Sequence, residues 1–378
     1  MKKRILIASD TLLPRMDGVS SFLNEIIPRL SRDYNVSVLA PRFDGDFKGY
    51  EGVRVIRFPV IKSIKLADTF ACIPDFRTVM KEVSKCDLVW AQDIAPVAVL
   101  SIIAAKTKKK PCVAYVHSLE WELYTKAISA TGPKAWFISS VMKFIDKIMY
   151  NRCSLLMVPS LEIGEILDWR GIKTAKNVVH LGTDSQRFKP PLNKDLAKKA
   201  LGLNQKKIVI GYAGRIGVEK DLVTLLRAFI RIHRKYPNTV LLIAGGGAEL
   251  IQPMVRSRDD VYVFGKTHHL EKYFQAMDIY VLPSLTETSS LSTMEAMSCG
   301  LAVVSTPVGF VKDYIKEGHN GMFFPKGNSL ALSRKLEKLI TDSALRKSVG
   351  FNARKTIQEK FSWEKTVNEI KEVFNTFL

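Results

Sequence analysis

The sequence has few cysteines and no long apolar run. Its 5 cysteines, among 378 residues, are an odd number without CxxC spacing, so reduced thiols are expected and a cysteine-rich zinc site is not indicated. The longest apolar run, residues 94–105, is shorter than the ~20 residues of a membrane-spanning helix. The first apolar run, residues 5–8, is shorter than the ~7 to 15 residues of a secretory signal core. We therefore expect a cytoplasmic chain with no spanning segment.

Acidic residues are also scarce relative to basic ones. The chain has 57 Lys and Arg against 37 Asp and Glu, a net charge of +20 that both halves share. Such an excess suits nucleic acid, an anionic membrane surface or phosphorylated ligands, and it also promotes solubility. The sequence offers no helix-turn-helix, zinc-finger spacing or aromatic RNP-type strand, so we expect no nucleic-acid partner.

Short runs of valine and isoleucine alternate with segments of helical period along the chain. The beginning predicts a strand at 5–9, a helix at about 20–30 and a strand at 36–40, the order of a βαβ unit. Further strands are predicted at 88–91, 113–117, 155–159 and 178–181, and after an interruption at 208–213, 240–244, 261–264, 279–283 and 302–306. The fold class is therefore α/β, with doubly wound parallel sheets covered by helices.

A proline pair and a lysine-rich stretch interrupt this alternation. We predict a Rossmann-like first domain at residues 1–187, a linker at 188–205 and a Rossmann-like second domain at 206–358. Ligands of open parallel sheets bind at the carboxyl ends of the strands, so two such domains facing each other would enclose a central cleft. Candidate site residues are therefore expected in the turns that follow strands.

Two turns of the first half carry candidate residues. Gly18 precedes the first helix, where a glycine lets the backbone approach an anion, although an ordinary turn explains it equally well. The turn is not GxGxxG, so a nicotinamide site loses its main support. His117 ends a predicted strand, where it could bind a ligand hydroxyl or act in acid–base chemistry. A purely structural histidine is the alternative.

Two cations in the second half follow a predicted strand. Arg215 and Lys220 lie five residues apart in a glycine-containing turn, where they could converge on a diphosphate. Solvated turn charges are the competing interpretation. The three glycines at 245–247 follow the next strand and permit a close approach of the backbone, but such runs also occur without a ligand.

Two glutamates form the most informative pattern. Glu287 lies in a loop after a strand, and Glu295 lies eight residues later on the predicted helix. An ionised carboxylate can accept hydrogen bonds from adjacent hydroxyls of a sugar or ribose. Acid and base carboxylates of a glycosidase are the rival chemistry. Apolar neighbours such as Leu291 and Met294 argue against a merely exposed charge on the helix.

Taken together, these segments resemble one enzyme family. The patterns PS-x2-E-x7-EAM-x2-G at 283–300 and GR-x3-EK at 214–220 are similar to those of the retaining GT-B glycosyltransferases, specifically the glycogen-synthase-like family GT4, or group 1. The DGVS loop at 17–20, the pair His117-Ser118, the segment LGTDSQRFKP at 181–190 and FSW at 361–363 extend the resemblance over nearly the whole chain. It implies the GT-B fold and a C-terminal helix at 359–378 that crosses back to the first domain.

The resemblance implies a metal-independent, retaining hexosyltransferase without a cofactor. Its donor would be a UDP- or GDP-linked sugar, and its acceptor a lipid-linked molecule or a glycan. His117 and Glu287 would be catalytic residues beside the transferred sugar, Glu295 would bind the ribose, and Arg215 and Lys220 would bind the diphosphate. Backbone groups would complete the donor site, at Gly18, Thr288, Ser289, Ser290 and Leu291 for phosphate and sugar and at Gly265, Lys266 and Thr267 for the base.

Two departures from the family pattern concern the donor. The first loop has Asp17-Gly18 where two glycines are usual, and Thr288, Ser289 and Ser290 replace a Gly-Phe-Gly-like triplet. The identity of the donor sugar is therefore not implied. Two other functions on this architecture stay open, a sugar-nucleotide 2-epimerase and a sugar-nucleotide-binding protein without catalysis.

Residues 133–152 form a predicted helix with an apolar face. Lys143 and Lys147 lie four residues apart on another face, and Trp136 lies near its start. A core helix of the first domain is one interpretation. A helix lying in an anionic interface is the other, in which these residues hold the enzyme reversibly on the cytoplasmic leaflet near a lipid-linked acceptor. A soluble acceptor is the alternative to that hypothesis.

Overall fold

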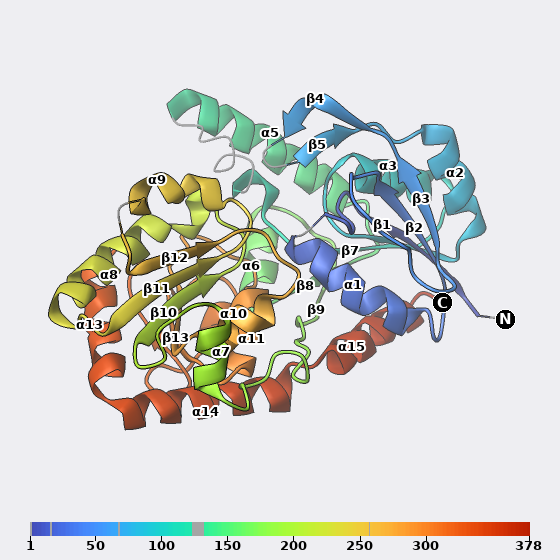
Figure 1. The fold of residues 1–378 in the computed structure, drawn as a ribbon. Helices are drawn as coiled ribbons and strands as arrows, with labels where there is room; N and C mark the ends of the chain where they lie inside the picture. Colours follow the sequence, from blue (N-terminus) through green and yellow to red (C-terminus); the bar gives the residue numbers. More distant parts are fainter. Residues whose placement is uncertain (1, 16, 67–68, 123–131, 257) are drawn as a thin grey trace. The chain divides into compact units, whose positions relative to one another are not determined.

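The chain folds into two compact units, each built on its own parallel sheet (Figure 1). The computed structural model describes residues 2–15, 17–66, 69–122, 132–256 and 258–378. One unit, called unit 1, consists of Met1–Leu181 together with Trp363–Leu378. The other, called unit 2, is Gly182–Ser362.

A seven-stranded parallel sheet forms the centre of unit 1, in the order β3-β2-β1-β6-β7-β8-β9. Its strands are β1 (Arg4–Ala8), β2 (Asn35–Pro41), β3 (Arg54–Phe58), β6 (Leu88–Ala91), β7 (Cys112–Tyr115), β8 (Leu155–Val158) and β9 (Lys176–Val178). A separate antiparallel pair consists of β4 (Val60–Leu66) and β5 (Thr69–Cys72). The central strands β6 and β7 are buried along their whole length, which explains their uninterrupted apolar sequences.

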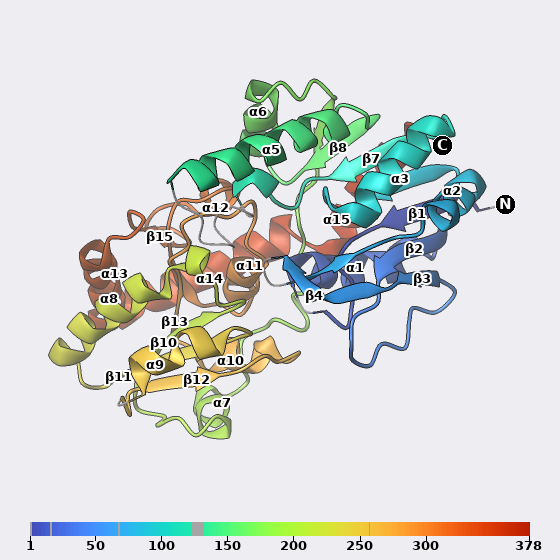
Figure 2. The same ribbon diagram turned by 90° about the horizontal axis from the view of Figure 1, so that it is seen from above.

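Helices cover the sheet of unit 1, and the last of them comes from the end of the chain. They are α1 (Gly18–Leu30), α2 (Phe76–Lys85), α3 (Pro96–Thr107), α5 (Gly132–Tyr150), α6 (Leu161–Trp169) and α15 (Trp363–Asn375). Helix α15 lies beside α1 in both views (Figures 1 and 2). The Thr366 hydroxyl donates to the His180 carbonyl at 2.8 Å, and the Phe374 ring packs against Trp90 at 5.3 Å. No helix within the described ranges is both long enough and apolar enough to span a bilayer.

Unit 2 is built on a six-stranded parallel sheet in the order β12-β11-β10-β13-β14-β15. Its strands are β10 (Ile208–Ala213), β11 (Thr239–Ala244), β12 (Val261–Phe264), β13 (Ile279–Leu282), β14 (Ala302–Ser305) and β15 (Met322–Phe323). Its α-helices are α7 (Lys194–Ala200), α8 (Leu222–Lys235), α9 (Gln252–Val255), α10 (Leu270–Ala276), α11 (Leu291–Ser298), α12 (Val311–Tyr314), α13 (Ser329–Thr341) and α14 (Ser343–Lys360). Two 3₁₀ turns, η1 (Val218–Lys220) and η2 (Ala248–Leu250), follow β10 and β11.

Residues 188–205, expected to be a linker, pack on unit 2 in the structure and include α7. The Lys198 ammonium is buried, 2.8 Å from the Asp278 carboxylate and 2.8 Å from the Lys207 carbonyl to which it donates. A lysine-rich stretch is typical of a solvated segment, but the ion pair of the buried Lys198 with Asp278 holds this segment on the unit. The division between the units accordingly falls after Leu181.

Candidate functional site

The loops at the carboxyl edge of the unit 2 sheet pack directly on one another. A Cβ atom on Gly245, whose φ is +150°, would lie 1.7 Å from the Gly214 carbonyl oxygen. A Cβ atom on Gly309, at φ +46°, would lie 2.1 Å from the Glu287 carbonyl oxygen. Glycine at these positions therefore lets the loops after β10 and β11, and those after β13 and β14, come into backbone contact.

The two predicted phosphate-binding cations each form an ion pair. Arg215 pairs with Glu219, four residues on, and Lys220 Nζ lies 2.5 Å from Glu287 Oε1. The Ser284 hydroxyl donates to the same Glu287 oxygen at 2.9 Å. Only 15% of the Lys220 side chain and 10% of the Glu287 side chain are exposed, so solvent screens this pair weakly. The structure thus brings Lys220 and Glu287 together.

Glu219 is a site residue that the sequence reasoning did not single out. It is buried on η1, and its carbonyl accepts a hydrogen bond from Leu285 N–H at 2.8 Å, which ties the loop after β10 to the loop after β13. A Cβ atom on Gly217 would lie 2.5 Å from a Glu219 carboxylate oxygen, so the ion pair with Arg215 occupies the space beside this glycine. The pattern GR-x3-EK could have identified Glu219 as a site residue, because the Glu of this pattern is Glu219.

Helix α11 begins in the loop that carries Glu287. Ser290 is its N-cap, and its hydroxyl accepts from Thr293 N–H at 3.4 Å. The Thr288 carbonyl accepts from Phe310 N–H at 2.9 Å, and the buried Ser289 hydroxyl has no hydrogen-bond partner among the described residues. Glu295 lies on α11 one turn after its start, as predicted. A helix N-terminus with this loop offers N–H donors to an anion.

The residues predicted to contact the base follow β12, which neighbours β11 in the sheet. The Phe264 carbonyl accepts from Gly245 N–H at 3.0 Å, and Lys266 lies 3.8 Å from the Cβ position of Gly246. The Thr267 hydroxyl accepts from His269 N–H at 3.1 Å. Residues 265–267 are therefore neighbours of the glycine run at the same edge as Arg215 and Lys220.

The first helix of unit 1 has its own carboxylate at its N-terminus. Asp17 is the N-cap of α1, accepting from Ser20 N–H at 2.8 Å and forming an ion pair with Arg15 at 2.6 Å. Gly18 is the first helical residue, and no atom lies within 4 Å of its Cβ position. The space expected at Gly18 is present, but Asp17 places a negative charge beside it.

His117 follows β7 in unit 1 and is partly buried among other side chains. Its Nε2 lies 3.0 Å from Gln92 Oε1, and its ring stacks on Tyr115 with centroids 4.4 Å apart. Burial lowers the pKa of His117 from 6.5 to about 3, so the ring is neutral at physiological pH. Gln92, like Glu219, was not singled out from the sequence, because a glutamine at a strand end carries no motif.

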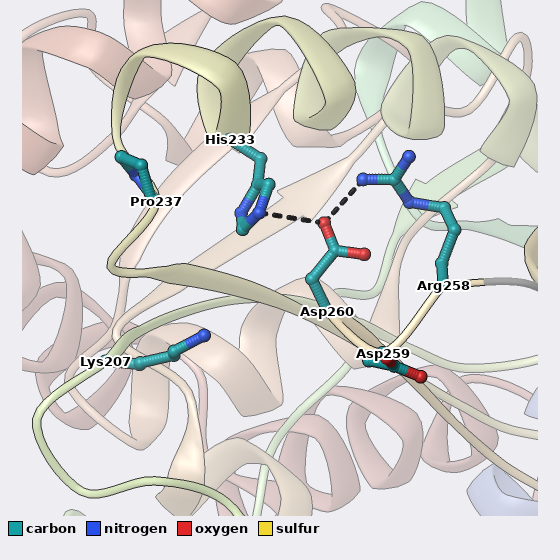
Figure 3. Close-up of a pocket in the computed structure, with 6 residues that line it drawn as sticks. All are labelled: Lys207, His233, Pro237, Arg258, Asp259 and Asp260. Carbon is teal, nitrogen blue, oxygen red and sulfur yellow. Dashed lines mark hydrogen bonds and ion pairs between the residues drawn. The ribbon is translucent and has the colours of Figure 1, made fainter.

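A separate hollow lies at the opposite edge of the unit 2 sheet (Figure 3). It is lined by Lys207, His233, Pro237, Arg258, Asp259 and Asp260. The Asp260 carboxylate pairs with Arg258 at 2.5 Å and lies 3.3 Å from His233 Nε2. The lining residues precede β10, β11 and β12, whereas ligands of parallel sheets bind where strands end. None of the predicted site residues lines this hollow, so it is not the candidate site.

Metal ligands are not grouped in the described part of the chain. No three His, Cys, Asp or Glu side chains of those residues are arranged to hold an ion. The positive charges at the candidate site are side chains and backbone N–H groups.

Two family models match the chain, one for each half. The model described as "Glycosyl transferases group 1" matches residues 193–356. The model described as "Glycosyltransferase Family 4" matches residues 16–187. Together they cover both units.

Several curated proteins are similar in sequence. The capsular polysaccharide biosynthesis glycosyltransferase CapM of Staphylococcus aureus is 30% identical over 52% of this chain and 53% of its own length. The GDP-mannose-dependent alpha-(1-6)-phosphatidylinositol monomannoside mannosyltransferase of Mycolicibacterium smegmatis is 23% identical over 95% of each chain. The UDP-Gal:alpha-D-GlcNAc-diphosphoundecaprenol alpha-1,3-galactosyltransferase of Escherichia coli is 25% identical over 98% of this chain and 97% of its own. The match thus spans about half of CapM and nearly all of the other two.

Solved structures share the fold over the whole chain. Anabaena HepE in complex with UDP-glucose has a TM-score of 0.82 at 19% identity, covering 100% of both chains. Sucrose-phosphate synthase from Thermosynechococcus elongatus has a TM-score of 0.81 at 21% identity, covering 99% of both. These likenesses confirm the predicted GT-B fold, with its two parallel-sheet α/β domains.

Proposed function

The chain belongs to the group 1 glycosyltransferases, and we propose that it transfers a sugar from a nucleotide-diphosphate sugar to a lipid-linked or glycan acceptor, with retention of configuration. One observation carries the proposal. The loops at the carboxyl edge of unit 2 bring two cations and two carboxylates together, as the ion pairs of Arg215 with Glu219 and Lys220 with Glu287. A diphosphate requires such cations, and a sugar requires such hydroxyl acceptors.

The Lys220–Glu287 pair suggests how the donor enters. The two charges neutralise each other in this ion pair, so a diphosphate that approaches Lys220 competes with the carboxylate. When the phosphate becomes the partner of Lys220, Glu287 is released to accept a hydrogen bond from a hydroxyl of the transferred sugar. Arg215 binds the same diphosphate while Glu219 holds its guanidinium. Each charge-assisted contact to phosphate is worth about 1.5–3 kcal/mol.

The remaining donor contacts follow the order of the loops. Glu295 on α11 binds the ribose, and the backbone of residues 265–267 lies against the base. N–H groups of residues 288–291 contact phosphate and sugar at the start of α11. Gly18 leaves space for a phosphate contact of the backbone, and His117 contacts a hydroxyl of the transferred sugar. The hydroxyls of Thr288, Ser289 and Ser290 shape the sugar pocket.

Transfer proceeds with attack on the face from which the diphosphate leaves. The bond between the anomeric carbon and the phosphate oxygen breaks, and its electron pair goes to the diphosphate, which Arg215, Lys220 and the α11 N-terminus stabilise. The acceptor hydroxyl oxygen bonds to the anomeric carbon, and its proton goes to the departing phosphate. These cations supply the charge that a metal supplies in other transferases, so we propose that the reaction is metal-independent and needs no cofactor.

The acceptor and the place of the reaction are suggested by α5 in unit 1. Its exposed fractions are 72% for Trp136, 63% for Phe137 and 64% for Phe144. At 100° per residue, Phe137, Val141 and Phe144 form one stripe, with Lys143 and Lys147 on its flank. An exposed apolar stripe with a basic flank suits a helix lying on an anionic bilayer. We propose that the enzyme lies reversibly on the cytoplasmic face of the membrane, near a lipid-linked acceptor.

A donor panel tests the proposed function. The chain is incubated with UDP- and GDP-linked sugars and with host lipid and polysaccharide extracts, and products are identified by mass spectrometry. Transfer from one donor class supports the proposal. Formation of an epimer without an acceptor would identify a 2-epimerase, and nucleotide binding without transfer or hydrolysis would identify a binding protein.

The same products test the two finer parts of the proposal. A coupling constant at the anomeric carbon that shows an α-linked product from an α-linked donor supports retention, and a β-linked product overturns it. Activity that persists in EDTA supports the metal-independent reaction. Loss of activity in EDTA with recovery in Mg²⁺ or Mn²⁺ overturns that part alone.

A further inference from the structure

Arg187 joins two segments of unit 2 that lie far apart in the sequence. It belongs to the segment LGTDSQRFKP at 181–190, which carries part of the family resemblance but has no assigned role. Its Nε and one terminal nitrogen lie 3.1 and 3.0 Å from the same carboxylate oxygen of Glu271, in the first turn of α10. That terminal nitrogen also donates to the His268 carbonyl, 81 residues away in the sequence. One guanidinium thus holds both the loop after β12 and the helix that follows it.

The backbone and the guanidinium of Arg187 are themselves held in place. The Asp184 carboxylate accepts from the backbone N–H groups of Gln186 and Arg187 at 2.9 and 3.0 Å. The guanidinium lies over the Phe188 ring, 5.0 Å from its centroid. Phe188 is buried and packs against Phe274 of α10, with 6.0 Å between the ring centroids. Arg187 therefore makes its contacts from a fixed position.

Glu271 connects Arg187 to a second residue of the loop. Its other carboxylate oxygen lies 2.9 Å from His269 Nδ1, and the Thr267 hydroxyl accepts from the His269 N–H at 3.1 Å. Burial raises the pKa of Glu271, but hydrogen bonds from its own backbone N–H, from His269 and from Arg187 outweigh burial and place this pKa below its usual value. The carboxylate is therefore ionised at neutral pH, and its pair with Arg187 is charged on both sides.

The backbone of this loop, residues 265–269 and here called the base loop, is open to a ligand. Gly265 and Lys266 are exposed, and no atom lies within 4 Å of the Cβ position of Gly265. Backbone N–H and C=O groups can distinguish bases, because the Watson–Crick edge of uracil presents acceptor, donor, acceptor and that of guanine presents acceptor, donor, donor. Such discrimination requires peptide groups that are held in one arrangement, since a loosely held loop accommodates either pattern.

We propose that Arg187 is a positioning residue that sets the base specificity of the donor site, because it holds the base loop by the His268 carbonyl and by the first turn of α10. The inference rests on the proposed function, which places the nucleotide base against residues 265–267. Arg187 acts through the loop and does not itself contact the base. All of these residues belong to unit 2. Arg215 and Lys220 lie on another loop, so their contacts with the diphosphate should not depend on Arg187.

Hydrogen exchange of the free full chain measures whether Arg187 holds the base loop. Arg187→Gln removes the charge and the forked contact. Peptides that cover the base loop and the start of α10 should exchange severalfold faster in Arg187→Gln than in the parent, whereas peptides of α8 should exchange at the parental rate. Arg258→Gln, which removes an arginine paired with Asp260 at the opposite edge of the sheet, is the matched control. Parental exchange of the base loop in Arg187→Gln would overturn the proposal.

Nucleotide binding measures the specificity itself. In calorimetric titrations with UDP and GDP the parent should prefer one of them, and Arg187→Gln should reduce that preference about tenfold by weakening the preferred nucleotide. Binding of inorganic pyrophosphate, which has no base, should be the same in Arg187→Gln, in Arg258→Gln and in the parent. A residue with a merely structural role would weaken pyrophosphate together with the nucleotides. Equal weakening of all three ligands would therefore contradict the proposal.

Glu271 gives an independent measure of the same action. Because it acts with Arg187 as one unit, Glu271→Gln should also reduce the preference, and the double variant should reduce it no more than Arg187→Gln alone. Additive losses would contradict this shared action. If the parent binds neither UDP nor GDP, the proposed function fails and the role of Arg187 with it. If the parent binds both equally, or if its preference is unchanged in Arg187→Gln, the positioning role alone is wrong.

Discussion

Lys220 Nζ and Glu287 Oε1 lie 2.5 Å apart, joining the loop after β10 to the loop after β13. The proposed function gives one of these residues to the donor phosphate and the other to the transferred sugar. The pair forms one neutral contact between the proposed phosphate-binding cation and the proposed hydroxyl acceptor. Binding of a diphosphate would exchange this contact for two new ones.

We expect a strong energetic coupling between these two side chains. Both are largely buried, so Lys220→Ala leaves a carboxylate without its partner, and the same holds for the reverse variant. Lys220→Ala, Glu287→Ala and the double variant, compared by thermal and denaturant unfolding, should give a coupling energy of about 1–3 kcal/mol. The exposed pair of Lys355 and Glu359, at 3.9 Å, is the control and should give at most about 0.5 kcal/mol. Equal coupling for both pairs would show that burial of the site pair has no effect.

Substitution of the two glutamates of the site, Glu287 and Glu295, should affect nucleotide binding and turnover differently. Glu295→Ala should weaken binding of the nucleoside diphosphate, because it removes the proposed ribose contact from α11. Glu287→Ala should lower turnover more than nucleotide binding, because the proposed function places its carboxylate against the sugar. Calorimetric titration with UDP and GDP, together with kcat and donor KM, separates the two effects. Glu359→Ala, an exposed glutamate of unit 2, is the matched control. If both site variants bind and transfer like the parent, the residue assignment is wrong.

Buried carboxyl groups make the stability of unit 1 dependent on pH. Asp146 of α5 is completely buried, and burial raises its pKa from 3.8 to about 8. Glu120, beside Tyr150, has its pKa raised by burial and then by the charge of Asp146. The folded state therefore binds more protons than the unfolded state between about pH 4 and pH 8. The stability from Asp146 is complete below its unfolded pKa and is lost as pH rises through the folded value.

Asp146→Asn should remove this dependence. The asparagine is neutral in both states, so the variant should gain thermal stability over the parent progressively from about pH 4 to pH 8, reaching about 3 °C or more at the upper end. Asp168→Asn, a largely exposed aspartate of the same unit, should show no such trend. A difference between Asp146→Asn and the parent that is the same at pH 5 and pH 8 would contradict the assignment of a protonated Asp146.

The exposed stripe of α5, together with the exposed Trp136 near the start of the helix, should bind anionic vesicles. Sedimentation with vesicles that contain anionic lipid should retain the parent at low salt and release it at high salt, since attraction of about 1 kcal/mol per basic residue is screened within a Debye length. Trp136→Ala with Phe144→Ala should reduce retention severalfold, whereas Phe351→Ala, an equally exposed aromatic of α14, should not. Equal recovery of the parent in the supernatant with neutral and anionic vesicles would remove the support for membrane contact.

The sheets could be predicted from the sequence because their strands are buried on both faces. Strand β10 has the predicted limits, Ile208–Ala213, and five of its six residues are buried. Strand β3 was missed. It contains Arg54 and Arg57, lies at the edge of its sheet, and only Phe58 in it is buried. An edge strand that is mostly half-exposed does not form an apolar run, so its sequence resembles a loop.

Helix α5 shows that the periodicity of apolar residues does not determine which side of a helix is buried. The helix itself was predicted, and the structure places it at Gly132–Tyr150. The side of the helix that packs against the rest of unit 1 was not predicted. In the structure Asp146 is buried, while Phe137 and Phe144 are exposed. A pattern of apolar residues identifies a face but not its partner, and a buried aspartate opposes the rule that charges lie outside.

Part of the candidate site could not be predicted from the sequence either. The spacing of Glu287 and Glu295 placed one on a loop and one on a helix, as the structure has them. The partners of the charges were not predictable, since the Lys220–Glu287 contact joins residues 67 positions apart. Gln92 and Glu219 were identified as site residues only from the contacts of their side chains in the structure.

Binding of a nucleoside diphosphate to the unit 2 loops is the most direct test of the account. Calorimetric titration of the full chain with UDP and with GDP should show one site per chain for one of them. Arg215→Ala and Lys220→Ala should each weaken that binding about tenfold to a hundredfold, as loss of a charge-assisted contact to phosphate requires. Lys207→Ala, in the hollow at the opposite edge of the sheet, should bind like the parent. No binding of either nucleotide, or equal affinity in the parent and in the Arg215 and Lys220 variants, would contradict the central claim.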